Sequence, residues 1–375
     1  MNQRLPVTLV GGFLGAGKTS LLHHVISEHR GGYLAVLVEN PGALNLDAKA
    51  LKGLCGAMRR VNDAVFEIPN GDEAAQVQAI AACLRDLAET GRYERVLIEV
   101  AGTANPAWLA EYFLAGGPLN PWGHLEQIIC VVDALDYFRS GAESSKSWGS
   151  FQDEQIASST LLVLNKCDLL DERELALCSA KLHQAHPGAQ VAETAYGEIP
   201  VEIWAKPAAR SEQVAAFKRR SALPLTELPS LSSALYRVHR PFHPERFWDW
   251  FNADHPGLLR VKGLVWLATR NLLVGGVSRT RWQNSCGAAG IWWAALPREE
   301  WPQEPEALLR MQETWREPYG DRRQELVLIG DAALLSTTTR KQLDACLLTD
   351  AEYARPVKEW ASFPDPFPAW DLEDS

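Results

Sequence analysis

Short apolar runs alternate with stretches of helical spacing from the start of the chain to about Trp204. Residues 76–90, for example, place Val77, Ile80 and Leu84 on one face of a helix. The apolar runs are rich in Val, Ile and Leu and have the length of buried strands. They lie at residues 5–10, 34–38, 65–68, 95–100, 128–132 and 161–164. Such runs, separated by helices, predict an α/β fold with a mostly parallel sheet covered on both faces.

A second pattern begins near residue 205. Residues 208–232 are rich in Pro, Ser, Ala and Lys/Arg and predict a linker after a first domain at 1–207. Residues 233–350 predict a smaller α+β C-terminal domain, with helices at 244–251 and 341–348. Its candidate strands are residues 235–238, 264–267, 291–294 and 325–329. The tail 351–375, rich in Pro and Trp, predicts an extended strap over the surface.

The first apolar run leads into Gly-Gly-Phe-Leu-Gly-Ala-Gly-Lys-Thr-Ser at residues 11–20. Residues 12–19 fit the phosphate-loop pattern G-x-x-x-x-G-K-[ST], between a predicted strand and a predicted helix. We therefore predict a P-loop NTPase fold, with a solvated Lys18 serving the β- and γ-phosphates and the Thr19 hydroxyl ligating Mg²⁺. The predicted nucleotide contacts here are Gly12, Gly15, Ala16, Gly17, Lys18, Thr19 and Ser20.

A guanine-reading pattern, N-K-x-D, follows the run at 161–164 as Asn165-Lys166-Cys167-Asp168. Guanine offers two parallel N–H donors on one edge, which a carboxylate accepts as a fork and which adenine lacks. We predict that Asp168 selects the base, that Asn165 contacts its other edge and that the stem of Lys166 packs over the ring. Together with the phosphate loop, this pattern predicts binding of GTP and GDP.

Acidic residues near two other strand ends are candidates for Mg²⁺ and water. Glu99, with Gly102 three residues later, takes the place of a Walker-B carboxylate, and we assign it a catalytic role beside Lys18. A simple helix N-terminal acid is the alternative interpretation of Glu99. Asp47, in the predicted switch segment 40–47, fits either an outer-shell acid or a helix cap.

Length, composition and charge disfavour several classes of protein. The 375 residues exceed what one core usually serves, and the net charge of -10 without a long basic run disfavours nucleic-acid binding. No apolar run approaches the roughly 20 residues that cross a membrane. Seven scattered cysteines without C-x-x-C predict reduced thiols in the cytoplasm. His239 and His243 flank Pro241 and do not share a helical face, which disfavours a metal site there.

The chain resembles the CobW-type GTPases, metallochaperone-like proteins related to the nickel-inserting GTPases of urease and hydrogenase maturation. The resemblance rests on the motifs above and on longer stretches in the second domain. The matching residues are 11–20, 99–102, 131–134, 165–170, 240–246, 262–270 and 320–327. It implies a GTPase domain followed by a C-terminal domain that docks client proteins or responds to nucleotide.

This chain departs from the family where metal is usually held. The family carries C-x-C-C directly after an Asn-Gly pair, whereas Asn70-Gly71 here precedes Asp72-Glu73-Ala74-Ala75. Two switch acids of the family match Asn40 and Ala43. Because thiolates make the tight zinc sites, zinc binding is doubtful, although Asp72 and Glu73 suit a harder cation.

The leading interpretation is a cytoplasmic GTPase that hydrolyses GTP slowly without a partner and gates contact with a client protein, for which a metalloenzyme is a candidate. Slow turnover is expected because the sequence offers no obvious water-positioning glutamine or arginine finger. One alternative is a metal-delivery GTPase whose ligands have moved to Asp72, Glu73 or the histidines. A non-hydrolysing nucleotide-gated scaffold is another. An ATP-using kinase leaves Asn165 to Asp168 unexplained.

Overall fold

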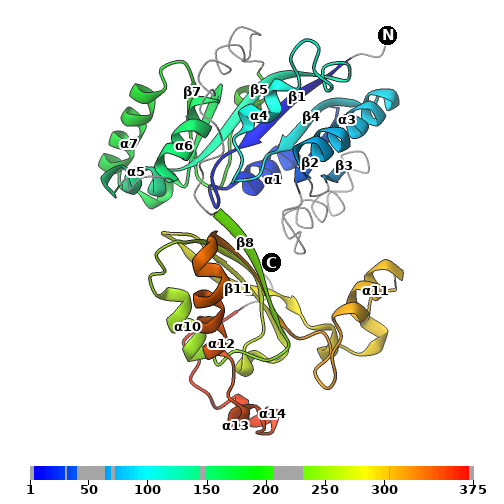
Figure 1. Cartoon of the computed structure of the whole chain (residues 1–375), viewed down its shortest axis with the longest axis vertical. Helices are drawn as coiled ribbons and strands as arrows, with labels where there is room; N and C mark the ends of the chain where they lie inside the picture. The colour runs from blue at the N-terminus through cyan, green and yellow to red at the C-terminus, as the bar shows by residue number, and fades with distance from the viewer. Residues whose placement is uncertain are drawn as a thin grey trace. The chain divides into compact units, whose positions relative to one another are not determined.

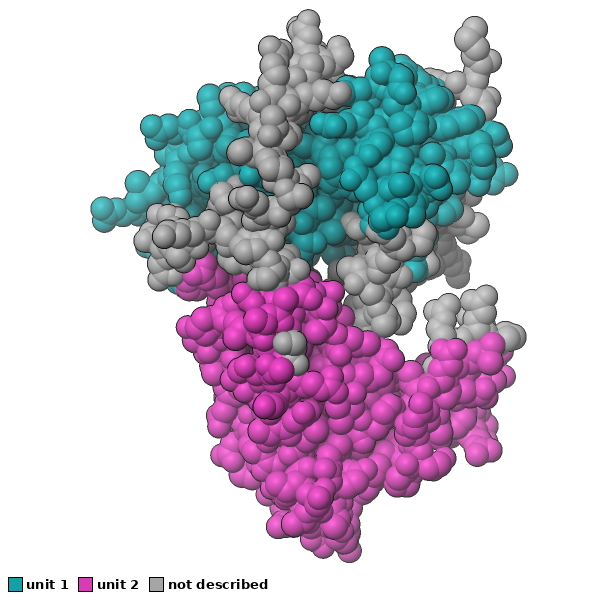
Figure 2. Space-filling view, in the orientation of Figure 1, with its two compact units in different colours: residues 1–228 teal, residues 229–375 magenta. Residues whose placement is uncertain are grey.

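The computed structural model describes residues 4–29, 32–39, 64–68, 72–143, 148–206, 231–303 and 305–370 (Figure 1). The chain divides into compact units at residues 1–228 and 229–375, coloured separately in Figure 2. The predicted switch segment with Asn40, Ala43 and Asp47, the Asn70-Gly71 pair and residues 208–230 of the predicted linker lie outside the described residues.

Unit 1 contains a seven-stranded sheet in the order β3-β2-β4-β1-β5-β6-β7, in which every pairing is parallel. Its strands are β1 (Leu5–Gly11), β2 (Tyr33–Glu39), β3 (Ala64–Ile68), β4 (Tyr93–Glu99), β5 (Gly123–Asp133), β6 (Leu161–Asn165) and β7 (Gln190–Glu193). The predicted α/β class and the six apolar strands are confirmed. The sequence analysis missed β7, because this four-residue edge strand reads Gln-Val-Ala-Glu and lacks an apolar run.

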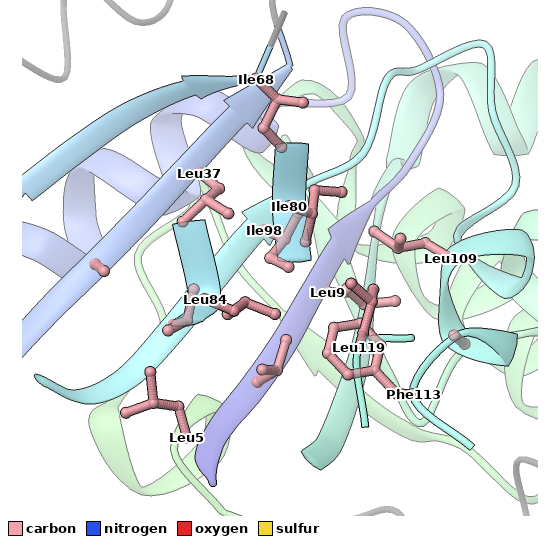
Figure 3. Close-up of a cluster of buried hydrophobic side chains, with 14 of the residues drawn as sticks. Leu5, Leu9, Leu37, Ile68, Ile80, Leu84, Ile98, Leu109, Phe113 and Leu119 are labelled. Carbon is pink, nitrogen blue, oxygen red and sulfur yellow. The ribbon is translucent and has the colours of Figure 1, made fainter. Parts of the chain in front are cut away.

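Helices cover both faces of this sheet. They are α1 (Lys18–Glu28), α3 (Glu73–Thr90), α4 (Pro106–Glu111), α5 (Ala134–Glu143), α6 (Trp148–Ala157), α7 (Glu172–Ala185) and α8 (Val201–Trp204). Because successive strand side chains point to opposite faces, Leu9 packs with α3 and α4, whereas Val10 packs with α1 and α8. Figure 3 shows the first of these clusters, with Ile80 and Leu84 of α3 near Leu37 and Ile98 of the sheet. The two cores fix the strands whose ends carry the predicted site.

Unit 2 contains a five-stranded antiparallel sheet in the order β11-β10-β9-β12-β8. Its strands are β8 (Leu231–Val238), β9 (Leu258–Val265), β10 (Leu273–Arg279), β11 (Asn284–Ile291) and β12 (Gln324–Asp331). Its longer helices are α10 (Pro244–Asn252), α11 (Pro305–Thr314) and α12 (Thr339–Cys346), and its short ones are α13 (Asp350–Tyr353) and α14 (Val357–Trp360). A smaller α+β domain is therefore confirmed.

Two predicted strands of unit 2 were misplaced. Residues 264–267 cover only the end of β9, and residues 291–294 run from the end of β11 into the 3-10 helix Trp293–Ala295. The apolar signal at 291–294 comes from a loop core, since Trp292 is buried with Trp266 and Trp360. β10 and β11 were missed because glycines and small residues interrupt their pattern. At Gly275 a Cβ would stand 2.5 Å from the ring of Trp370.

The tail of unit 2 packs against the core that α10 and α12 cover. Arg270 donates to both carboxylate oxygens of Asp365, at 2.8 and 3.0 Å, and its guanidinium lies 4.3 Å from the ring centre of Trp370. Phe367 and Trp370 are both buried in this core. Within the predicted strap 351–375, residues 361–370 lie against this core, whereas residues 351–353 and 357–360 are helical in α13 and α14 instead of extended.

Among the described residues, no helix has the length and apolar character needed to cross a membrane.

Candidate nucleotide-binding site

The predicted motifs converge at one edge of the parallel sheet. β1, β4, β5 and β6 are contiguous in the sheet, and Val10 is level with Glu99 while Asp133 is level with Asn165. Because parallel strands end at the same edge, the phosphate loop, Glu99 and the Asn165–Asp168 segment follow neighbouring strand ends. This is the edge at which open α/β sheets bind ligands.

The backbone of the phosphate loop adopts conformations that favour glycine at three positions. Gly12, Gly15 and Gly17 have φ values of 131°, 81° and 106°, in the left-handed region that side chains disfavour. At Gly12 a Cβ would also stand 2.2 Å from the carbonyl oxygen of Val131. The loop can therefore wrap closely before α1 begins at Lys18, with Ala16 buried within it and Thr19 and the exposed Ser20 in the first helical turn. A helix N-terminus facing a loop of this shape suits an anion.

Lys18 is buried, with only 7% of its surface exposed, so the expected solvated side chain is wrong. Its Nζ donates to the carbonyl oxygen of Gly12 at 2.7 Å and to that of Phe13 at 3.3 Å. The loop carbonyls hold the ammonium group inside the curve of the loop, because a buried charge needs such partners. Phosphate oxygens are better acceptors for the same group.

Glu99 and Gly102 bring a second segment to the loop. Glu99 ends β4 and is 8% exposed. A Cβ on Gly102 would stand 3.1 Å from Lys18 Nζ and 3.0 Å from the amide nitrogen of Leu14. The close approach explains why glycine occupies position 102, and it sets the loop after β4 against the group predicted to hold phosphate.

Asn165 connects the phosphate loop to the segment that follows β7. Its Nδ2 donates to the carbonyl oxygen of Ala16 at 2.9 Å, and its Oδ1 accepts from the amide of Gly197 at 2.9 Å. The side chain is 1% exposed. The sequence did not predict this bridge between the phosphate loop and the segment after β7, while contact of Asn165 with guanine stays a prediction.

Lys166 and Asp168 face different surroundings. Lys166 has φ 63° and donates from Nζ to Asp133 Oδ2 at 2.6 Å, so an ion pair orients its side chain. Asp168 is exposed in the 3-10 helix Cys167–Leu169. An exposed carboxylate next to a rigid strand end can accept hydrogen bonds from a base. The predicted roles of both residues toward guanine stay predictions.

Two further residues at this edge of the sheet are not predicted by any sequence motif. Tyr196 is 72% exposed with φ 57°, directly before the glycine that Asn165 holds. Gln155 of α6 is 1% exposed and bonds to the loop that contains Gly102. A tyrosine in a short Thr-Ala-Tyr-Gly segment and a glutamine in a helix carry little signal without the tertiary contacts.

The residues near the missing thiol motif have structural partners. Asp72 accepts from the amide of Ala75 at 2.9 Å and caps α3, and Glu73 accepts from the Tyr112 hydroxyl at 2.6 Å. Burial raises the pKa of the Cys83 thiol, ten residues after Glu73 in α3, to about 11, which disfavours the thiolate that binds metal. Over the described part of the chain, no cluster of three or more His, Cys, Asp or Glu side chains is placed to hold a metal ion.

Comparison with known proteins matches both units. The family model described as "CobW/HypB/UreG, nucleotide-binding domain" matches residues 6–193, and the one described as "Cobalamin synthesis protein cobW C-terminal domain" matches residues 231–347. These matches confirm the resemblance and the P-loop fold predicted from the sequence.

Three relatives show how far the similarity extends. A zinc-regulated GTPase metalloprotein activator 1 of Dictyostelium discoideum is 29% identical over 97% of this chain and 84% of its own length. A zinc chaperone CobW of Pseudomonas aeruginosa is 33% identical over 53% of this chain and 59% of its own length. A zinc chaperone YjiA of Escherichia coli is 25% identical over 73% of this chain and 86% of its own length.

Proposed function

Because the chain belongs to the CobW/HypB/UreG family and is a GTPase of that family, we propose that it hydrolyses GTP slowly and uses its nucleotide state to gate contact with a client protein. The observation that carries this proposal is the bridge through Asn165. One buried amide joins the phosphate loop at Ala16 to the segment after β7 at Gly197. A nucleotide that shifts the phosphate loop would therefore also shift the segment after β7, through Asn165.

The residues at the loop fit a Mg²⁺–nucleotide. Lys18 would exchange the carbonyl oxygens of Gly12 and Phe13 for β- and γ-phosphate oxygens, while the backbone of Gly15 to Gly17 lines the phosphates. Thr19 and Glu99 would hold Mg²⁺, which supplies positive charge to the phosphates. At the other end Asp168 would read guanine, with Asn165 and Lys166 beside the base and the exposed ring of Tyr196 against it.

Slow hydrolysis follows from what the motif segments lack. Residues 11–20 and 99–102 contain neither a glutamine nor an arginine. The glutamine that reaches the Gly102 loop, Gln155, donates its amide hydrogens to two backbone carbonyls. Since residues 11–20 and 99–102 supply neither a water-orienting side chain nor an arginine to offset the developing charge, we expect turnover to depend on a partner that supplies one.

The client is proposed to be a protein, with a metalloenzyme as the candidate class, because relatives are named as a zinc chaperone and a metalloprotein activator. Gating is favoured over metal carriage, since Asp72 and Glu73 stand where the family has thiols and serve a helix cap and a tyrosine. Delivery of metal through relocated ligands remains the alternative. The unpaired cysteines of the described residues agree with the cytoplasm as the proposed location.

Nucleotide turnover with the whole chain tests the enzymatic part. Release of phosphate from Mg²⁺–GTP and Mg²⁺–ATP is measured at equal concentrations, and we expect slow turnover of GTP and little of ATP. Equal turnover of both would contradict the base-reading role of Asp168. Tight GTP binding with no phosphate release over hours would instead favour the non-hydrolysing scaffold.

Hydrogen exchange tests the gating part. The whole chain is compared with GDP and with a non-hydrolysable GTP analogue. We expect protection that differs between the two nucleotides both at residues 99–105 and in at least one segment of unit 2. Differences confined to unit 1 would leave the C-terminal domain without a nucleotide signal and contradict gating.

A further inference from the structure

Gln155 is a buried polar residue whose side-chain amide donates hydrogen bonds to one backbone loop. Its Nε2 donates to the carbonyl oxygen of Ala104 at 2.8 Å and to that of Gly102 at 3.3 Å. With 1% of its surface exposed, it has no access to water. Two facing carbonyls accept only from the amide nitrogen, so the amide orientation is fixed by its partners.

The oxygen atom of this side-chain amide shows that burying Gln155 has a free-energy cost. Gln155 Oε1 is buried and has no hydrogen-bond partner among the described residues. A buried acceptor left without a partner costs about 1–3 kcal/mol. An apolar side chain of the same size would avoid that cost, so packing alone does not account for a glutamine at this position.

The loop that Gln155 holds is anchored at both ends and passes the phosphate site in between. The amide of Val100 donates to the carbonyl of Val10 at 2.9 Å, and the Asn105 side chain caps α4 by accepting from the amide of Ala107 at 3.0 Å. Gly102, between these anchors, lies against Lys18 Nζ. Fixing the carbonyls of Gly102 and Ala104 therefore fixes two peptide planes of a loop that lies against Lys18 Nζ.

The helix that carries Gln155 also contacts the phosphate loop directly. Phe151, one turn earlier in α6, packs edge-on against Phe13, with ring centres 6.3 Å apart. α6 thus contacts the phosphate loop through Phe151 and the loop after β4 through Gln155. These two segments must keep their spacing while the terminal phosphate is transferred.

We propose that Gln155 is a positioning residue for GTP hydrolysis, which orients the Gly102 loop against the terminal phosphate without touching the nucleotide. This inference rests on the proposed nucleotide site at Lys18. It assigns to the glutamine of α6 a role that is specific to the triphosphate state, because GDP has no group at the position that Gly102 faces.

The first test is Gln155→Met, which keeps the length of the side chain and removes the donor. We expect kcat for GTP to fall about tenfold, the size of one lost hydrogen bond in the transition state. We expect KM for GTP and the Kd for GDP to stay within about twofold of the parent. The matched control is Gln127→Met, since Gln127 of β5 is also 1% exposed with a buried Oε1 that lacks a hydrogen-bond partner within the described ranges. Gln127 is level with Thr8 of β1, which lies about 10 Å along the strand from Gly11 at the start of the phosphate loop.

The second test is the pH dependence of Gln155→Glu, compared with that of Gln127→Glu at an equally buried site, because ionising a buried carboxyl group destabilises either site. A carboxylate has no hydrogen to donate to the two carbonyls, whereas a protonated carboxyl group has one. Burial raises the pKa of a carboxyl group, so we expect kcat of this variant, relative to the parent, to rise as the pH falls from about 8 to about 6. Should Gln155→Met fail to fold, this profile decides the proposal.

Hydrogen exchange of the whole chain separates this proposal from the proposed function. In Gln155→Met we expect faster exchange at residues 101–105 and unchanged exchange elsewhere in unit 1, whether or not the protein turns over GTP. A parent without GTP turnover contradicts the proposed function, whereas faster exchange at residues 101–105 in Gln155→Met would still show that Gln155 orients the Gly102 loop. A flat pH ratio for Gln155→Glu, unchanged exchange at 101–105, or equal losses of kcat in Gln155→Met and Gln127→Met would overturn the role of Gln155.

Discussion

Gly17 and Asn165, far apart in the sequence, are in such close contact that a Cβ on residue 17 would stand 2.2 Å from Asn165 Nδ2. The same Nδ2 donates to the carbonyl of Ala16 at 2.9 Å. The phosphate loop is therefore supported by the segment that is predicted to read the base. This contact makes the two halves of the nucleotide site one unit.

Replacing Asn165 with alanine should weaken both GTP and GDP binding by about tenfold or more, because the Ala16 carbonyl and the Gly197 amide lose their shared partner and are left unpaired. Equilibrium titration with each nucleotide measures the effect. Asn120→Ala is the control, since the Asn120 amide donates to the Phe113 carbonyl at 2.7 Å in another part of unit 1. A loss confined to GTP would show that Asn165 does not brace the loop.

Lys18→Ala should lower GTP affinity by about a hundredfold while the protein stays folded, because the ammonium group is predicted to bind phosphate and its present acceptors are loop carbonyls. The comparison is Lys181→Ala, which removes a lysine from above the Tyr137 ring. Equal GTP affinity in Lys18→Ala and the parent would refute the phosphate-loop assignment.

Asp168→Asn should bind xanthosine triphosphate better than GTP. Xanthine carries a carbonyl where guanine has its exocyclic amine, so an amide donor suits it and a carboxylate does not. Asp171→Asn is a matched control, because Asp171 is a neighbouring carboxylate that caps α7. If Asp168→Asn retained the parental preference for GTP, another residue would have to read the base.

With GTP and Mg²⁺ present, the protein should hold Zn²⁺ far more weakly than a relative with the C-x-C-C motif. Structural zinc sites use about four ligands, mostly thiolate or imidazole, whereas Asp72 and Glu73 offer oxygens that already have partners. Competition against a chelating dye of known affinity, with and without GTP, measures the difference. Stoichiometric sub-nanomolar uptake would support relocated ligands, which Glu73→Ala and His243→Ala variants would then help to locate.

Unit 2 should lose stability in acid through one ion pair. Hydrogen bonds from Arg246, at 2.7 and 3.0 Å, hold the pKa of Glu352 at about 2, below its ordinary value of 4.5. Because the folded pKa is the lower one, the pair stabilises the fold above about pH 4.5, and the contribution disappears as the pH falls toward 2.

The variant Glu352→Gln should therefore cost about 1–2 kcal/mol at neutral pH, clearly less at pH 3 and little near pH 2. Chemical unfolding of the whole chain at several pH values, followed through the transition of unit 2, measures it. The exposed Glu359 of α14 gives the control variant, Glu359→Gln. A constant difference between Glu352→Gln and the parent from pH 7 to pH 3 would contradict the assignment.

The sequence by itself determined the class of fold and the segments that form the site. Buried parallel strands need continuous apolar runs, and phosphate loops need glycine where φ is positive, so both leave local patterns such as residues 5–10 and Gly12, Gly15 and Gly17. Only the tertiary structure decided that Lys18 is buried, that Asn165 braces the phosphate loop and that Gln155 holds the Gly102 loop. It also placed β10 and β11, whose small residues fit against Trp370 and each other without an apolar pattern. The hydrogen bonds from Gln155 to Ala104 and from Asn165 to Ala16 join residues 51 and 149 positions apart, and such bonds depend on packing that no local pattern records.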